Sequence, residues 1–501
     1  MKRIYTYILA LVILNSCTSD FLDVSPTTSI PESEFYNSED RIMQGLMAAY
    51  APLKWPDCAF GQYNPLQFIS DIMSDDVLVG GANANDSEYM HRMRAFNATP
   101  VYVCDALWTV FYSGVNRSNI VINKIDGVPD LSESKKDRIL AEARALRAYY
   151  YFWLWKLWGN VPFYTENPST PPYLIEQIGA DELYSKIIED LDFALENDRL
   201  PANLPDNELG RFTKSAVQML KANTVMYQRD NSRYVDVLTD MREIIISRQF
   251  DLVDDFALIW EDEGEWNEES IFEINYSDEL GERWYGDGLV AGGSAYPLTI
   301  GINNVKNTRF NTGWGYEPVE PELYELYDNI DQRKDGGILN FAKLKMSSPT
   351  ASYDPRYQDT GLFNLKYLPR VGGNDLCTGD KERNYRNNYR VYRFSETLLI
   401  ASELIVRTGG PQSEADEYLN RVRKRAYRGS GSYEKTATLE NLLLENRLEF
   451  ALEGHRFWDL VRFGEAENVL GSRGYTSSKK HLPIPLSEID KAQNTLKQNP
   501  Y

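Results

Sequence analysis

Hydrophobic residues recur at spacings of three and four along much of the chain, which is the period of an amphipathic α-helix. Besides one long stripe that ends near Gly159, this pattern predicts helices over 39–53, 107–126, 181–196, 214–228 and 234–248. Most of these segments are separated by polar or turn residues, as expected for a series of packed helices. The longest stripe ends at Gly159 and Pro162, residues that terminate helices, and is formed by Ile139, Ala143, Leu146, Tyr150, Trp153 and Leu157.

The helical pattern returns after residue 390, where two amphipathic stripes are separated by Gly409-Gly410-Pro411. A helix, a tight turn and a second helix in roughly 34 residues match the length of a tetratricopeptide repeat, although its strict consensus is absent. We therefore predict a mostly α fold, a tetratricopeptide-like superhelix with one half in 39–250 and the other in 391–501. The two stripes consist of Phe394, Leu398, Ala401 and Ile405, and of Ala415, Leu419, Val422 and Ala426.

Residues 251–390 differ from both helical parts. The helical period fades, glycine and asparagine become frequent, and aromatic residues stand in loop contexts such as ERWYGDGLVAGGSAYPL and NTGWGYEPVEP. Long loops in a compact protein are usually functional or disordered, and this aromatic content argues against disorder. We expect a large, loop-rich insertion that binds a ligand.

The stretch LENRLEFALEGHRFWDLVRFG, residues 444–464, is dense in ionisable side chains. Its apolar stripe, Leu444, Leu448, Ala451, His455 and Trp458, has helical spacing and predicts a packed histidine. Glu445, Glu449 and Glu453 form a neighbouring ridge, followed by Arg456, which suits ion pairs along or between helices. Retaining glycosidases need two carboxylates about 5–5.5 Å apart across a cleft. Because successive glutamates of one helix line a face instead, the pattern favours a structural role.

The N-terminus predicts an exported and lipidated protein. Lys2 and Arg3 precede an apolar run, residues 4–14, which is too short to span a bilayer and has the length of a signal-peptide core. The run ends in Leu-Asn-Ser-Cys17, which looks like the processing site of a bacterial lipoprotein; an ordinary secretory signal is the alternative. We therefore expect a signal peptide in 1–16, acylation of Cys17 and a tether over 17–38.

Charge and composition exclude several functions. With 53 Lys and Arg against 74 Asp and Glu, the net charge of −21 argues against nucleic acid as a partner. Three scattered histidines and the lack of a CxxC motif make a zinc site improbable, and no dinucleotide or phosphate-binding glycine motif is present. Asp75, Asp76 and the acidic run 261–265 offer oxygen ligands for calcium but lack a loop motif, which favours solvated loop charge. No cofactor or metal is expected.

The 444–464 stretch also resembles the signature helix of the RagB/SusD family, with Asn446 in place of an expected glutamate, which suggests a rearranged ion pair. Four further blocks resemble this family in the same order: AEARALRAYYYFWLWKLWGNVPF (141–163), GRFTKSAVQMLKANTVMY (210–227), YRVYRFSETLLIASELIVR with LNRVRKRA (389–407, 419–426), and HLPIPLSEID with QNPY (481–490, 498–501). The resemblance covers nearly the whole chain.

This resemblance implies a SusD-like lipoprotein on the outer face of the outer membrane. Its members capture oligosaccharides or polysaccharides, less often peptides, and deliver them to a SusC-like TonB-dependent barrel. They are not enzymes. Sugars present apolar C–H faces and many hydroxyls, so aromatic platforms with a few polar groups suit them.

The family's ligand residues lie in variable loops, so the candidates here rest on composition and loop position. Packing of a loop onto the helices is the alternative role for each aromatic residue. The expected platforms are Trp284, Tyr285, Tyr296 and Trp314, then Trp266, with Trp55 and Tyr63 in a loop of the N-terminal half that can close over the same cleft; the expected hydroxyl partners are Asn303 and Asn304.

Two other functions stay open. A glycoside hydrolase is possible because carboxylates are plentiful, and a peptide-binding helical-repeat lipoprotein is possible because superhelices present concave faces to proteins. The position of the exposed aromatic residues distinguishes them. Aromatic residues in the 251–390 loops favour a small or polymeric ligand, whereas aromatic residues along the helical groove favour a peptide.

Overall fold

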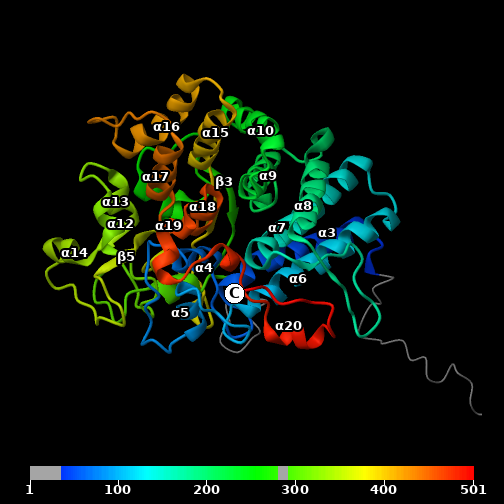
Figure 1. Ribbon diagram of the computed structural model, residues 1–501, viewed down its shortest axis with the longest axis horizontal. Coiled ribbons are helices and arrows are strands. Elements are labelled where there is room, and N and C mark those ends of the chain that lie inside the picture. The colour runs from blue at the N-terminus through cyan, green and yellow to red at the C-terminus, as the bar shows by residue number, and fades with distance from the viewer. Residues whose placement is uncertain (1–34, 280–291) are drawn as a thin grey trace, which may run out of the picture.

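The computed structural model describes residues 35–279 and 292–501 and is mostly helical (Figure 1). All five shorter segments predicted in the first half form helices, with ends within three residues of the expected ones. After α3 the chain continues as a 3₁₀ segment, Ala51–Asp57, in which two prolines remove backbone donors. The helices of this half are α3 (Glu39–Tyr50), α4 (Leu66–Ile72), α5 (Glu88–Arg94), α6 (Asp105–Lys124), α7 (Glu133–Trp158), α8 (Ala180–Leu195), α9 (Lys214–Gln228) and α10 (Tyr234–Ser247).

Consecutive helices pack against one another and build the predicted superhelix. Contacts run from α3 to α6 and then through α7, α8, α9 and α10 in chain order. The next partner of α10 is α15 (Phe394–Thr408), which packs on α16 (Gln412–Ala426) across a turn where Gly409 has a φ of 70°. The helical stack therefore passes directly from α10 to α15, although residues 251–390 separate these helices in the sequence. The mostly α, tetratricopeptide-like fold is confirmed.

Helix α7 lies at the centre of the first half. Between Ala141 and Trp158 all but one of its residues are buried, because α6 covers one side and α8 another. The amphipathic stripe predicted for this segment is therefore only part of its buried surface. The sequence Tyr149-Tyr150-Tyr151-Phe152-Trp153 places aromatic side chains all round the helix. A buried pair, Arg147 to Asp190 at 2.8 Å, ties α7 to α8.

The 251–390 region is a large excursion closed at its base by two strands. Strand β3 (Ser270–Ile274) pairs antiparallel with β6 (Tyr389–Arg393), which leads directly into α15. A separate small hydrophobic cluster, with Ile302, Phe310 and Phe363 among its members, stabilises the excursion. Its other elements are α11 (Tyr296–Ile300), α12 (Pro321–Leu326), α13 (Gln332–Gly337), α14 (Phe341–Ser347) and the hairpin of β4 (Ile338–Asn340) with β5 (Leu362–Asn364). The remaining pair is β1 (Val161–Pro162) with β2 (Gln177–Ile178).

The 444–464 stretch is two helices rather than one. Helix α17 (Leu439–Phe450) and α18 (Arg456–Phe463) are separated by a break in which Leu452 and Gly454 have φ values of 67° and 84°. The chain ends with α19 (Ala466–Leu470) and α20 (Leu486–Lys491). The single apolar stripe predicted here is wrong, because Leu444 is 37% exposed. His455 is packed as expected: its ring stacks on Phe450, and burial lowers the pKa of His455 to about 4.

The glutamate ridge of this stretch is a buried ion-pair network. Glu445, Glu449 and Glu453 are almost completely inaccessible to solvent. Arg333 of α13 contacts Glu445 at 2.7 Å and Glu449 at 3.0 Å, and Arg393 of β6 contacts Glu449 at 3.0 Å. The predicted structural role is therefore correct, and the partners come from the excursion and from β6. Further contacts join Lys366 to Glu453, Arg423 to Glu445, and Arg425 to Glu449 and Glu269.

Asp75 and Asp76 are not the solvated loop charges that the sequence favours. Asp76 is completely buried and contacts Arg447 at 2.7 Å, while Asp75 contacts Arg456 at 2.8 Å and Arg447 at 2.9 Å. These aspartates therefore anchor the loop after α4 to the signature segment instead of lying in solvent. In the acidic run, Glu261 is bound by Arg370 at 2.6 Å. Within the described ranges, no group of three or more potential ligand side chains is placed to hold a metal ion.

Candidate functional site

An open pocket lies where the loop before α5 meets the excursion. We call it the Trp314 cleft; its volume is about 360 Å³, within the range of small-molecule sites. Short backbone pairings bring its two sides together: Gly81 N donates to Gly315 O at 3.1 Å, and Glu317 N donates to Val79 O at 2.9 Å. Its walls are Tyr63, Asp86, Ser87, Met90, Thr299, Trp314, Tyr316 and Arg356.

Glycine permits the close approach of these two sides. Gly80 has a φ of 77°, and a Cβ atom there would lie 2.4 Å from Gly315 O. Any larger residue at position 80 would therefore push the loop of residues 77–86 away from the segment that carries Trp314 and Tyr316.

Two aromatic rings from opposite sides of the Trp314 cleft form its main apolar feature. Tyr63 and Trp314 are perpendicular, with centroids 4.9 Å apart. The Arg383 guanidinium lies over both rings, 5.2 Å from the Tyr63 centroid and 5.9 Å from that of Trp314. Such cation–π contacts hold aromatic side chains in place. The pair is therefore a preorganised corner rather than two independent loop residues.

Polar groups are spaced around this corner. Tyr316 Oη and Ser87 Oγ lie 2.9 Å apart, Asp86 accepts from Ala82 N at 2.7 Å, and Arg356 Nη1 donates to Trp314 O at 2.7 Å. Burial raises the pKa of the Tyr316 hydroxyl, so this group stays protonated at neutral pH. The Trp314 cleft thus combines apolar ring surface with hydroxyl, carboxylate and guanidinium groups.

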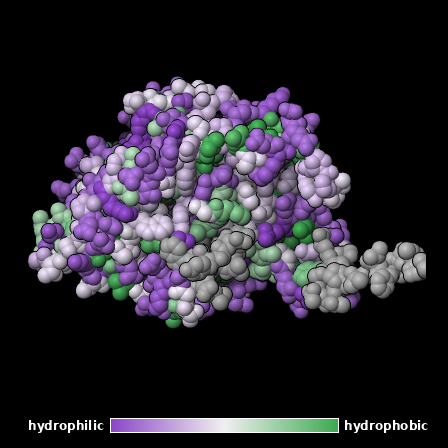
Figure 2. All heavy atoms as spheres, turned by 90° about the horizontal axis from the view of Figure 1, so that it is seen from below, coloured by the Kyte–Doolittle hydropathy of each residue, from purple (hydrophilic) through white to green (hydrophobic). Residues whose placement is uncertain are grey.

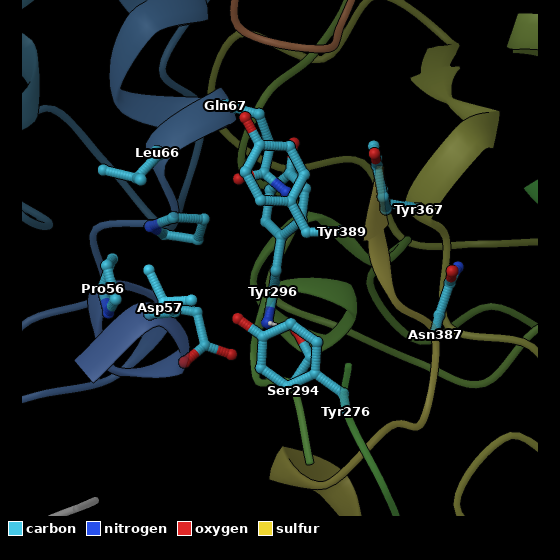
Figure 3. Close-up of a pocket in the computed structure, with 12 residues that line it drawn as sticks. Pro56, Asp57, Leu66, Gln67, Tyr276, Ser294, Tyr296, Tyr367, Asn387 and Tyr389 are labelled. Atoms are coloured by element: carbon cyan, nitrogen blue, oxygen red, sulfur yellow. Dashed lines mark hydrogen bonds between the residues drawn. The ribbon is translucent and has the colours of Figure 1, made fainter. Parts of the chain in front are cut away.

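Of the candidates named from sequence, Tyr63 and Trp314 meet in the Trp314 cleft. Tyr296 and Trp55 are 1% and 4% exposed, so in this structure both rings pack in the core and offer no open face. Tyr296 donates to Glu317 at 2.6 Å and lines a small interior cavity together with Tyr367 and Tyr389 (Figure 3). That cavity has a volume of about 10 Å³, enough for at most one water molecule and too small for a sugar.

Trp266, Asn303 and Asn304 lie outside the Trp314 cleft. Trp266 is half-buried and donates through Nε1 to Asn275 at 2.9 Å. Asn303 and Asn304 both bond to Asp354, through its carbonyl and its carboxylate respectively. Cys17, Trp284 and Tyr285 lie outside the described residues.

Sequence reasoning missed most of the polar lining. Tyr316 could have been identified from the sequence, because it follows Trp314 by two residues in the aromatic loop segment NTGWGYEPVEP. Asp86, Ser87 and Arg356 carry no motif, and they join the site only because of the backbone pairings described above. Asp86 is the one carboxylate that lines the Trp314 cleft among the described residues.

No helix in the described part of the chain has both the length and the apolar character needed to cross a membrane.

Fold and cleft together define a helical-repeat protein with an aromatic pocket beside an inserted, loop-rich region. A model of the SusD family matches residues 338–501, and a model described as "Starch-binding associating with outer membrane" matches residues 20–223. Relatives agree: SusD-like protein P25 of Formosa agariphila is 25% identical over 98% of this chain and 96% of its own length.

Two solved structures have a higher sequence identity to this chain than that relative. Surface glycan-binding protein A from Bacteroides thetaiotaomicron, in complex with laminarihexaose, is 43% identical, with a TM-score of 0.88 over 93% of this chain and 100% of that chain. A laminarin-binding SusD-like protein is 32% identical, with a TM-score of 0.83 over 93% of this chain and 100% of that one. This chain therefore belongs to the SusD family.

Proposed function

We propose that this protein is a cell-surface lipoprotein that captures glycan chains in the Trp314 cleft. The observation that carries the proposal is the Tyr63–Trp314 corner, held by Arg383 beside hydroxyl and charged groups. Aromatic faces suit the C–H faces of a sugar, and the polar lining suits its hydroxyls. Because the site is open, it binds part of a long chain without enclosing it.

The ligand class we propose is a laminarin-type glucan. Support comes from the laminarihexaose complex of the 43% identical relative and from the laminarin-binding relative at 32%. The lining of the Trp314 cleft is compatible with a neutral sugar, because it offers both a carboxylate, Asp86, and a guanidinium, Arg356.

Family membership and the N-terminal sequence support a proposal for location and partner. We propose acylation of Cys17, attachment to the outer membrane facing the cell exterior, and delivery of the glycan to a SusC-like TonB-dependent barrel. A Cys17→Ser variant expressed in the native cell is then released from the membrane fraction and loses labelling by a fatty-acid probe. Retention with unchanged labelling would contradict the anchor.

We also propose that the protein is not an enzyme. A glycosidase of the usual kind needs a pair of carboxyl groups about the cleaved bond, whereas Asp86 is the one carboxylate lining the Trp314 cleft in the described chain. Glu445, Glu449 and Glu453 are bound to buried cations and are not accessible to a polymer.

The test is native electrophoresis of the chain beginning after Cys17, in gels containing laminarin, with assay for new reducing ends. We expect retardation of the unsubstituted chain, its strong reduction in Trp314→Ala, and no reducing ends. Trp266→Ala is the matched control, because this tryptophan lies outside the Trp314 cleft. If Trp266→Ala abolishes retardation and Trp314→Ala does not, the binding site lies at Trp266 and not in the Trp314 cleft. Cleavage of the polysaccharide would establish a hydrolase.

A further inference from the structure

A second concavity lies between α6, the connection from β1 to β2, and the C-terminal segment around α20. We call it the Tyr173 groove. Its volume is about 720 Å³, twice that of the Trp314 cleft, and it shares no residue with that cleft. Among the residues that line it are Trp108, Tyr112, Asn116, Tyr164, Asn167, Tyr173, Glu488 and Lys491.

Aromatic rings form much of this groove. Tyr112 and Tyr164 are nearly parallel, with an interplanar angle of 11° and centroids 6.0 Å apart. Trp108 lies beside Tyr112, with centroids 5.1 Å apart. Tyr173 is 57% exposed, whereas most tyrosines of this protein are buried or half-buried. The groove thus has a fixed aromatic wall and one aromatic side chain that is open to solvent.

The polar groups of the groove are neutral or mutually neutralised. Tyr164 donates to Asn116 Oδ1 at 2.8 Å, and Asn167 Nδ2 donates to Asn116 O at 2.9 Å, so these amides are fixed in place. At the rim, Lys491 pairs with Glu488 at 2.8 Å. No other charged side chain lines the groove among the described residues. Aromatic surface next to ordered amides suits a neutral, hydroxyl-rich ligand better than a charged one.

We propose that the Tyr173 groove is a second glycan-binding site that contacts the same polysaccharide as the Trp314 cleft. This inference rests on the proposed function for the identity of the glycan. A contact links the elements that carry the two sites: Gln62, next to Tyr63, accepts from Ala106 N at 3.3 Å at the start of α6, the helix that carries Trp108. The loop between α5 and α6 is bonded to the start of α20, since Leu486 N donates to Pro100 O at 2.8 Å.

Two sites that contact one polysaccharide favour long chains over short ones. The face seen from below is mostly hydrophilic, with separate hydrophobic patches (Figure 2). When one site holds a chain, the second binds at a high effective concentration, which raises the affinity for the polymer without a new contact. A hexasaccharide that fills a single site gains nothing from this effect.

The experiment compares four proteins that begin after Cys17: the unsubstituted chain, Trp314→Ala, Tyr173→Ala and the double variant. Each is run in native gels containing laminarin and titrated with laminarihexaose by calorimetry. Tyr433→Ala is the matched control, because this loop tyrosine lines neither pocket. Tyr173 is a surface side chain, so its removal is expected to leave the fold intact, which circular dichroism checks.

We expect Tyr173→Ala to weaken laminarin binding at least about threefold, through lost avidity, while Trp314→Ala keeps weak retardation that the double variant loses. If Trp314→Ala alone abolishes all retardation and Tyr173→Ala equals the control, the second site is wrong and the proposed function stands. If the double variant matches Trp314→Ala, the residual binding lies elsewhere and the inference is also wrong. If the unsubstituted chain is not retarded, both proposals fail for this glucan.

Discussion

The rings of Tyr63 and Trp314 meet at right angles with centroids 4.9 Å apart, although Tyr63 lies in the first helical half and Trp314 in the inserted region. Tyr63 belongs to the loop before α4, and Trp314 belongs to the excursion between β3 and β6. The contact therefore joins the helical scaffold to the inserted region at the candidate site. Because Arg383 lies over both rings, the geometry of the corner depends on all three side chains.

This relationship predicts that the two rings act as a unit in binding. Trp314→Ala is expected to weaken laminarihexaose binding by at least about tenfold, or about 1.4 kcal/mol, and Tyr63→Ala by less. The double variant is expected to lose less than the sum of the two single losses, because each ring holds the other in place. Calorimetric titration of all four proteins measures this coupling. Additive losses would show that the rings bind independently.

A second prediction concerns the buried carboxylate of Glu449. It is bound by Arg333, Arg393 and Arg425, which hold the pKa of Glu449 below its usual range despite burial. Removing one partner of a buried network leaves uncompensated charge, so Glu449→Gln is expected to cost about 3–5 kcal/mol in the free energy of unfolding. Urea denaturation near pH 7 measures the loss.

The control for this prediction is Glu440→Gln, an exposed residue in the first turn of the same helix. It is expected to cost less than about 1 kcal/mol. Because the pKa of Glu449 is lowered on folding, its stabilising contribution is present above the unfolded pKa of about 4.3 and is lost as the pH falls below it. Equal costs for the two variants would contradict a central role for Glu449.

The fold was largely predictable because it depends on local periodicity. Helix α9 occupies the predicted residues 214–228, since its apolar spacing is regular and Thr213 caps its start. The break between α17 and α18 was not predictable from periodicity, because the apolar spacing continues through Leu452, which adopts a positive φ. Gly454 was the available signal for that break.

The site was only partly predictable because it depends on pairing between distant segments. The aromatic loop composition indicated Trp314, and the N-terminal loop indicated Tyr63. Whether an aromatic residue faces a cleft or the core is set by tertiary packing, which placed Tyr296 and Trp55 inside. The partners of Glu449 likewise come from α13, β6 and α16, and spacing along one helix gives no information on them.

A third prediction is a pH effect from the buried side chain of Glu396. Burial is the main cause that raises the pKa of Glu396 to about 8, while Asn223 Nδ2 donates to its carboxyl group at 2.9 Å. Between the unfolded pKa of about 4.3 and the folded value, the native state binds the extra proton. The stability contributed by this group is therefore present at low pH and is lost as the pH rises toward 8, by at most about 1.4 kcal/mol per pH unit.

Glu396→Gln tests this effect because the amide is close in shape to the protonated carboxyl group. The variant is expected to match the unsubstituted protein near pH 5 and to exceed its free energy of unfolding at pH 8. Urea denaturation at several pH values gives the comparison. A stability difference that stays constant from pH 5 to 8 would show that Glu396 does not titrate in this range.

The last prediction separates ion pairing from calcium binding at Asp75 and Asp76. Arg447 contacts both carboxylates and Arg456 contacts Asp75, so guanidinium groups occupy positions that a cation would need. Loss of the buried Asp76 charge in Asp76→Asn is therefore expected to cost about 2–3 kcal/mol, less than at Glu449, because Arg447 keeps Asp75 as a partner. A chelator is expected to leave the melting temperature of the unsubstituted protein unchanged. If the chelator lowers it and added calcium restores it, a metal ion stabilises the protein; a further loss of that response in Asp76→Asn would place the ion at this loop.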